Sequence, residues 1–133
     1  MKKIILLTIA IVIVMISNVA LACGGVTFLG NSGKSYCLSK FTMNWYSAYA
    51  WCKDQGMNLI ELDTTCGASS GSCSELALSS AEQSNITAAG GKIGTVWTNT
   101  SHTSPTAFVV NLSSGKVINF GRDNLTYGYA VCF

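Results

Sequence analysis

Hydrophobic and polar positions follow their clearest pattern over residues 45–62, WYSAYAWCKDQGMNLIEL. The first part predicts an amphipathic α-helix, because apolar residues recur at intervals of three and four positions and so share one face. The residues on that face are Trp45, Ala48, Tyr49 and Cys52. Gly56 follows where the end of a helix favours a residue that tolerates positive φ. From Leu59 to Asp63 the residues alternate with period two, which predicts a half-buried strand.

Two short strands are predicted ahead of this helix, over 26–29 and 35–41. The segment 31–33, Asn-Ser-Gly, lies between them and favours a turn, so the two strands are expected to form a hairpin. The helix is then expected to begin near Thr42 or Asn44, because either side chain can cap it by accepting a hydrogen bond from a backbone N–H.

A second helix is predicted from Ser79 to Ala89. Ser79 stands three residues before Glu82, which is the spacing of a capping box, and Gly90 and Gly91 end the helix. The pattern after it predicts strands only, at 93–98, 106–112, 116–120 and 127–133. Together these elements predict an α+β domain.

A basic start, an apolar centre and a small-residue exit predict that residues 1–22 form a secretory signal peptide. Two lysines come first, the apolar run covers 4–16, and cleavage is expected after Ala22. The remaining residues, 23–133, fit one domain. We expect that domain to be secreted, displayed at the cell surface or periplasmic, with the cleaved leader as its only link to the membrane.

Two alternatives to simple cleavage stay open. Residues 4–22 are just long enough to span a bilayer as an uncleaved helix. Lipidation of Cys23 is the other alternative, although Ala20 occupies the position where bacterial lipoprotein signals usually carry leucine.

The charge of the mature chain argues against one class of partner. Two of the eight basic residues lie in the leader, so residues 23–133 carry six basic and six acidic side chains. A neutral domain without a basic run lacks the electrostatic footprint of nucleic-acid binding. It also lacks the polybasic patch that attracts a protein to anionic membranes. Nucleic acid is therefore not an expected partner.

All six cysteines lie after the leader, and an even count in a short secreted chain predicts a disulfide framework. Count alone allows fifteen pairings. Local bridges are the economical choice for four of the cysteines, and the remaining two then pair with each other. The predicted pairs are Cys23–Cys37, Cys66–Cys73 and Cys52–Cys132. Without a Cys-x-x-Cys motif or an unpaired thiol, neither a metal site nor a cysteine nucleophile is expected.

The stretch 45–59 resembles the C-type lectin-like family. That family has a Trp-x-x-Ala-x-x-x-Cys helix followed by Gly and Leu, and the matching residues here are Trp45, Ala48, Cys52, Gly56 and Leu59. Glu82 matches the glutamate that begins the family's second helix, and Trp97 loosely matches its core tryptophan strand. Residues 129–132 match the last strand, whose cysteine is bonded to the first helix. The resemblance covers essentially all of 23–133.

Cys23 and Cys37 match the additional N-terminal bridge of the family's long form. The resemblance implies two helices packed on a small antiparallel sheet and stapled by disulfides. It also implies a module that binds a ligand rather than an enzyme.

The resemblance fails at the family's calcium-dependent sugar site. Sugar-binding members carry Glu-Pro-Asn or Gln-Pro-Asp on a long loop and then Trp-Asn-Asp, because calcium needs six to eight oxygen ligands. Here the segment 98–127 is short, and Pro105 follows a serine. Residues 122–124, Arg-Asp-Asn, stand where Trp-Asn-Asp is expected, and the family's second cysteine pair is missing. We therefore expect binding without calcium and without any cofactor.

Candidate catalytic residues are sparse. His102 is the only histidine, and as a lone histidine in a polar loop it is expected to be solvated. Glu61 and Asp63 would share a strand face and could form an acid/base pair or half of a metal site, but such residues are more often simply the solvated face of an amphipathic strand. Serines are abundant, but a single histidine gives little support to a Ser-His-Asp triad. An enzyme is not expected.

Aromatic side chains offer another route to ligand binding, by stacking on sugars. Trp45 and Trp97 are expected in the core from their positions in the resemblance. Trp51 and Tyr46 are expected to be partly exposed.

These observations predict a secreted or surface-displayed binding module for a protein or glycan on a cell surface. The two-lysine leader is typical of a bacterial protein, which suggests an adhesin or a pilus-associated subunit. The resemblance places the ligand-binding residues where the family's long loop emerges: Thr98, Asn99, His102, Arg122, Asp123 and Asn124. The main alternative is a structural or tip subunit of a secreted or pilus-like assembly, which would show as self-association. A small inhibitor or effector with one tight protein partner is the third.

Overall fold

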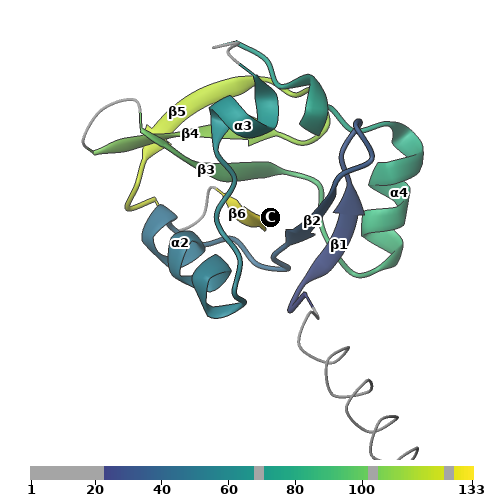
Figure 1. Ribbon diagram of the computed structural model, residues 1–133, viewed down its shortest axis with the longest axis horizontal. Helices are drawn as coiled ribbons and strands as arrows, with labels where there is room; N and C mark the ends of the chain where they lie inside the picture. Colours follow the sequence, from purple (N-terminus) through teal and green to yellow (C-terminus); the bar gives the residue numbers. More distant parts are fainter. Residues whose placement is uncertain (1–22, 68–70, 102–104, 125–127) are drawn as a thin grey trace, which may run out of the picture.

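The computed structural model describes residues 23–67, 71–101, 105–124 and 128–133 (Figure 1). The predicted leader therefore lies outside the described residues. Along the described chain the elements are β1 (Val26–Leu29), β2 (Ser35–Leu38), α2 (Trp45–Asp54), α3 (Leu62–Cys66), the 3₁₀ turn η1 (Ser74–Leu76), α4 (Ser80–Ala88), β3 (Thr95–Ser101), β4 (Thr106–Asn111), β5 (Val117–Gly121) and β6 (Tyr129–Cys132).

Six strands form one sheet in the order β1-β2-β6-β3-β4-β5. The last strand, β6, is inserted in the middle, antiparallel to β2 and parallel to β3. The domain is thus α+β, as predicted, but its sheet is mixed rather than purely antiparallel. Figure 1 shows α4 alongside β1 at one end of the sheet and α2 beside β6, and these are also the elements that each helix contacts most.

The two main helices begin and end where local chemistry predicts. Asn44 is the N-cap of α2, and its side chain accepts a hydrogen bond from Ser47 N at 2.8 Å. Ser79 caps α4 by accepting a bond from Glu82 N at 3.3 Å. Gly56, just beyond α2, has φ of 71°, which an L side chain adopts only with strain.

The predicted strand at 59–63 is wrong. Leu59 forms only an isolated bridge to Cys132, and the chain turns into helix α3 at Leu62, with Glu61 as its N-cap. Leu59 and Ile60 are both fully buried, so the inside-outside alternation of a surface strand is absent. Glu61 and Asp63 are exposed at the start of a helix and do not share a strand face.

Trp97 on β3 is fully buried, as predicted, and its indole N–H donates to Met43 O at 2.7 Å. The indole packs so closely on Gly128 that an added Cβ there would lie 2.6 Å from Nε1, so only glycine fits without a shift. Trp45, by contrast, is only half-buried, and Tyr49 is 37% exposed. The buried stripe of α2 is narrower than predicted, with Ala48 and Cys52 as its fully buried members.

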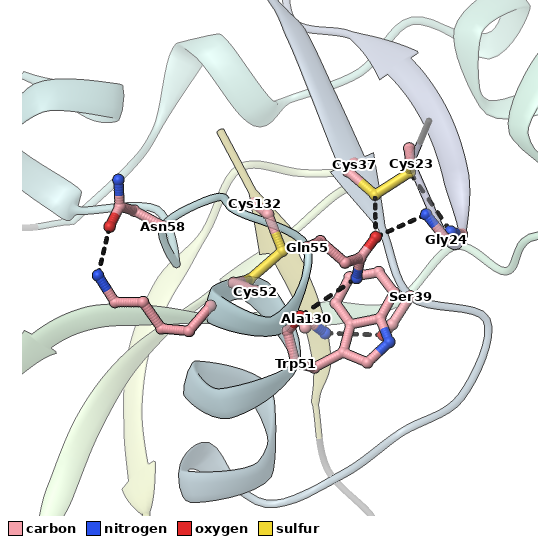
Figure 2. The surroundings of a disulfide bond; sticks show 12 residues. Cys23, Gly24, Cys37, Ser39, Trp51, Cys52, Gln55, Asn58, Ala130 and Cys132 are labelled. Carbon is pink, nitrogen blue, oxygen red and sulfur yellow. Dashed lines mark hydrogen bonds between the residues drawn. A yellow bond between two sulfur atoms is a disulfide. The ribbon is translucent and has the colours of Figure 1, made fainter. Parts of the chain in front are cut away.

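All three predicted disulfides are present: Cys23–Cys37, Cys52–Cys132 and Cys66–Cys73. Figure 2 shows two of them near the end of α2, where Gln55 Oε1 accepts a bond from Gly24 N at 2.6 Å. The amide of Gln55 also donates to Trp51 O at 3.2 Å, so the first bridge is tied to α2. Because the Cys23 sulfur is bonded to Cys37, thioether lipidation of Cys23 and this disulfide exclude each other.

Candidate functional site

The structure brings together the two parts of the predicted ligand site. Asn99 lies on β3, and Arg122 directly follows β5. Arg122 N donates to Pro105 O at 2.9 Å and its Nε donates to Thr106 O at 3.2 Å, which ties the turn after β5 to the start of β4. Asp123 is exposed and Asn124 half-buried in the same turn. His102, which was also predicted to bind the ligand, lies outside the described residues.

Thr98 is fully buried, unlike its predicted neighbours in the site. Its hydroxyl donates to Phe108 O at 2.9 Å, and its carbonyl accepts a bond from the indole N–H of Trp45 at 2.9 Å. Thr98 is therefore placed to hold Trp45 in position rather than to face solvent. Asn99 is exposed, while its backbone N–H donates to Ile60 O at 2.7 Å.

Helix α2 starts at this same place. Trp45 N donates to Arg122 O at 2.9 Å, and the Arg122 guanidinium carbon lies 4.4 Å from the centroid of the Trp45 ring. The guanidinium also donates to the Ser101 hydroxyl. Three bonded or stacked contacts thus fix the arginine between α2 and the β3–β4 end of the sheet.

The aromatic contacts continue along α2 for two more turns. The Trp45 and Tyr49 rings stack with centroids 5.5 Å apart and planes at 24°. The Lys53 ammonium lies 5.5 Å from the centroid of the Tyr49 ring. Because residues 45, 49 and 53 are four apart, they lie one above another on the helix. We call the set Arg122, Trp45, Tyr49 and Lys53 the cation–aromatic row.

Tyr46 lies beside this row. Its ring meets the Trp45 ring edge-on, with centroids 5.3 Å apart and planes at 87°, and it remains 56% exposed. Phe41, in the loop before α2, is 77% exposed. Exposed aromatic side chains therefore occur both in the loop before α2 and on the first two turns of the helix.

The sequence did contain a signal for this surface. Four of the ten residues of α2 are aromatic, at positions 45, 46, 49 and 51, and they cannot all fit one buried stripe. The helical pattern placed Trp45 and Tyr49 inside, whereas the extent of the face that the sheet covers depends on tertiary structure.

A second polar region lies on the opposite part of the fold, around the β1–β2 turn. A groove of about 500 Å³ is lined there by Asn31, Ser32, Lys34, Tyr36, Thr64, Thr65, Ser74 and Glu75. Glu75 accepts hydrogen bonds from Ser32 N at 2.6 Å and from the Tyr36 hydroxyl at 2.8 Å. Its carboxylate thus ties the hairpin turn to η1.

Burial acts to raise the pKa of Glu75, but the hydrogen bonds from Ser32 and Tyr36 and the charge of Lys34 outweigh it and lower that pKa below 4.5. Burial raises the pKa of the Tyr36 hydroxyl, and the neighbouring Glu75 carboxylate raises it further. Both groups therefore keep their usual charge states near neutral pH, which suits a structural tie better than proton transfer.

Among the residues that the structure describes, no three His, Cys, Asp or Glu side chains gather where they could hold a metal ion. Segments 102–104 and 125–127 border the candidate site and lie outside that description. Binding without calcium therefore stays a prediction. In the described ranges no helix combines the length and apolar character needed to cross a bilayer.

No protein-family model matches the chain, and no curated protein is similar to it at a significant level.

Proposed function

We propose that residues 23–133 form a secreted or surface-displayed binding module that recognises a protein or glycan without calcium. One observation carries the proposal: three of the most exposed large hydrophobic side chains, Phe41, Tyr46 and Tyr49, come from one nine-residue stretch. Arg122 lies against the same surface. Exposed aromatic residues grouped with arginine are typical of binding surfaces, because tyrosine, tryptophan and arginine dominate binding hot spots.

We also propose that the module is a compact member of the C-type lectin-like fold. Two features support this assignment: the Cys52–Cys132 bridge from the first main helix to the last strand, and the Cys23–Cys37 bridge at the N-terminal hairpin. The ligand would be contacted by Asn99, Arg122 and the exposed part of the 123–124 turn. In this proposal the aromatic face of α2 takes the part that calcium plays in the family's sugar-binding members.

We propose no catalytic role for this site. The six cysteines are all in disulfides, so none is a free nucleophile. The chain has a single histidine, and general-base activation of a serine by histidine would depend on that one residue. The described partners of the Arg122 side chain are a backbone carbonyl, a serine hydroxyl and an aromatic ring.

The test is a binding screen of the purified, disulfide-bonded protein against glycans and extracellular proteins, run with calcium and then with a chelator. Binding that survives the chelator and falls at least about tenfold in Tyr46→Ala supports the proposal. Leu29→Ala is the matched control, since Leu29 is an exposed apolar residue (48%) on the distant strand β1. Binding abolished by the chelator, or equally weakened by both substitutions, would contradict it.

The same purified protein also tests the alternative that the chain is a subunit of an assembly, through its self-association. A protein that binds no glycan or foreign protein, but self-associates as its concentration rises, would favour that alternative.

A further inference from the structure

The cation–aromatic row carries positive charge at its start. The Arg122 guanidinium has neutral partners among the described residues: the Thr106 carbonyl, the Ser101 hydroxyl and the Trp45 ring. These contacts hold the planar group in place without offsetting its charge. A guanidinium fixed in this way has lost its side-chain entropy before a ligand arrives, which favours binding.

A second cation lies at the other end of the row. The Lys53 ammonium contacts the Tyr49 ring and donates to the Asn58 side-chain oxygen at 2.6 Å, again a neutral partner (Figure 2 shows Asn58 beside the end of α2). Residues 45 and 53 are eight apart, so the row extends about 12 Å along the helix axis. The two cations therefore flank an aromatic surface longer than one sugar ring.

We propose that this face binds a carboxylated saccharide, with a sugar carboxylate at Arg122 and the sugar rings beside Tyr46 and along the row toward Lys53. The inference depends on the proposed binding function and names its ligand class. A guanidinium matches a carboxylate because its planar fork of N–H donors can form two parallel hydrogen bonds. The adjoining aromatic rings offer apolar area for the C–H faces of a sugar.

The backbone around the row favours a saccharide over an acidic peptide. Strand β3 is paired on both sides, with β6 over Val96–Trp97 and with β4. The residues of α2 form a helix whose first N–H groups are bonded to Arg122 O and to Asn44. On this side of the sheet, an extended peptide could therefore add a strand only at β5, the outer strand, and not at β3 or α2 beside the row. Exposed Asn99 instead offers an amide group that can bond sugar hydroxyls.

One neighbouring charge opposes such a ligand. Asp123 is exposed next to Arg122 in the same turn, and its carboxylate would repel an incoming anion. Its removal should therefore strengthen the binding of an acidic sugar more than that of a neutral sugar. A gain of affinity cannot be explained by a loss of folding, so this variant tests the charge directly.

The experiment compares trigalacturonic acid with its methyl ester, which has the same sugars without the charges, by calorimetry on protein exported from the full chain. We expect the acid to bind about tenfold or more tightly than the ester. Arg122→Gln should remove that preference, whereas Asp123→Asn should raise affinity for the acid about two- to fivefold. Lys92→Gln is the matched control for lost positive charge, because Lys92 is exposed outside the row.

Thermal unfolding of each variant checks that the domain still folds. If Arg122→Gln fails to fold, Asp123→Asn and the dependence of acid binding on salt decide the question. Equal binding of acid and ester, an unchanged affinity in Asp123→Asn, or binding of poly-glutamate but of no saccharide would overturn the inference. Ester binding that Tyr46→Ala abolishes would still support the proposed binding function. Absence of binding to every glycan and protein would overturn both.

Discussion

Glu75 illustrates how one carboxylate organises a turn. It accepts bonds from Ser32 and Tyr36, which lie on the hairpin more than thirty residues earlier in the chain. The pKa of Glu75 is lowered in the folded state. A carboxyl whose folded pKa lies below its unfolded value stabilises the fold above the unfolded pKa and loses this contribution as pH falls through the folded pKa.

We predict that Glu75→Gln lowers the free energy of unfolding at pH 7 by about 1 kcal/mol or less, since the group is largely solvent-screened. The difference from the parent protein should shrink below about pH 4, where the carboxylate becomes protonated. Urea unfolding at pH 7 and at pH 3 measures both values. A difference that is the same at the two pH values would show that packing, not charge, is responsible.

Single residues also mark the limit of sequence reasoning at the candidate site. The family resemblance placed Thr98 among the ligand-binding residues, and the structure buries it, because both faces of β3 are covered from Val96 to Thr98. Tyr49 differs in the opposite direction: the helical period predicted it on the buried face, and the structure leaves it partly exposed. Both depend on which faces the sheet covers, and a periodic pattern in one segment does not contain that information.

Helix α4 begins with half of the predicted capping box. The Ser79 hydroxyl accepts a bond from Glu82 N, as predicted. The Glu82 carboxylate, however, accepts a bond from Leu29 N on β1 at 2.9 Å, and so joins the helix to the edge strand. The spacing of the two residues identified the cap, whereas the long-range partner could not be predicted because β1 lies fifty residues away.

We predict that Ser79→Ala lowers the free energy of unfolding by about 1 kcal/mol, because an N–H at the start of α4 loses its acceptor. Ser80→Ala is the matched control: Ser80 is exposed inside the first turn, where alanine is a better helix former. Chemical denaturation of the two variants gives the comparison. Equal stability of both variants would mean that the cap contributes nothing measurable.

The prediction of a strand at 59–63 was wrong for a similar reason, because the structure of this segment depends on long-range partners. Ile60 N donates to Val131 O, and Ile60 O accepts a bond from Asn99 N, so the residue bridges β6 and β3 where these parallel strands diverge. Ile60 has these partners only because the last strand, β6, lies in the middle of the sheet beside β3. The two main helices and the six strands were predictable because caps, glycines and turn residues act locally.

For the domain as a whole, the disulfide framework was predictable and the strand order was not. Two of the bridges close short loops, with separations of 14 and 7 residues, and the third pair followed by elimination. The position of β6 between β2 and β3 depends on pairing between distant segments. The Cys52–Cys132 bridge, over 80 residues, fixes that strand to α2.

We therefore predict unequal effects of removing two bridges. In the chain-entropy treatment, loss of Cys52–Cys132 costs about 4.5 kcal/mol and loss of the shorter Cys66–Cys73 bridge about 2.5 kcal/mol. Urea unfolding of the Cys52→Ala/Cys132→Ala and Cys66→Ala/Cys73→Ala variants measures the difference. Cys52 lies on α2, which also carries Tyr46 and most of the cation–aromatic row. Under conditions where both variants are folded, only Cys52→Ala/Cys132→Ala should therefore weaken ligand binding. Equal losses of stability would contradict the predicted difference between the two bridges. Weaker binding in the Cys66→Ala/Cys73→Ala variant would contradict the inference that the Cys52–Cys132 bridge holds the binding face in place.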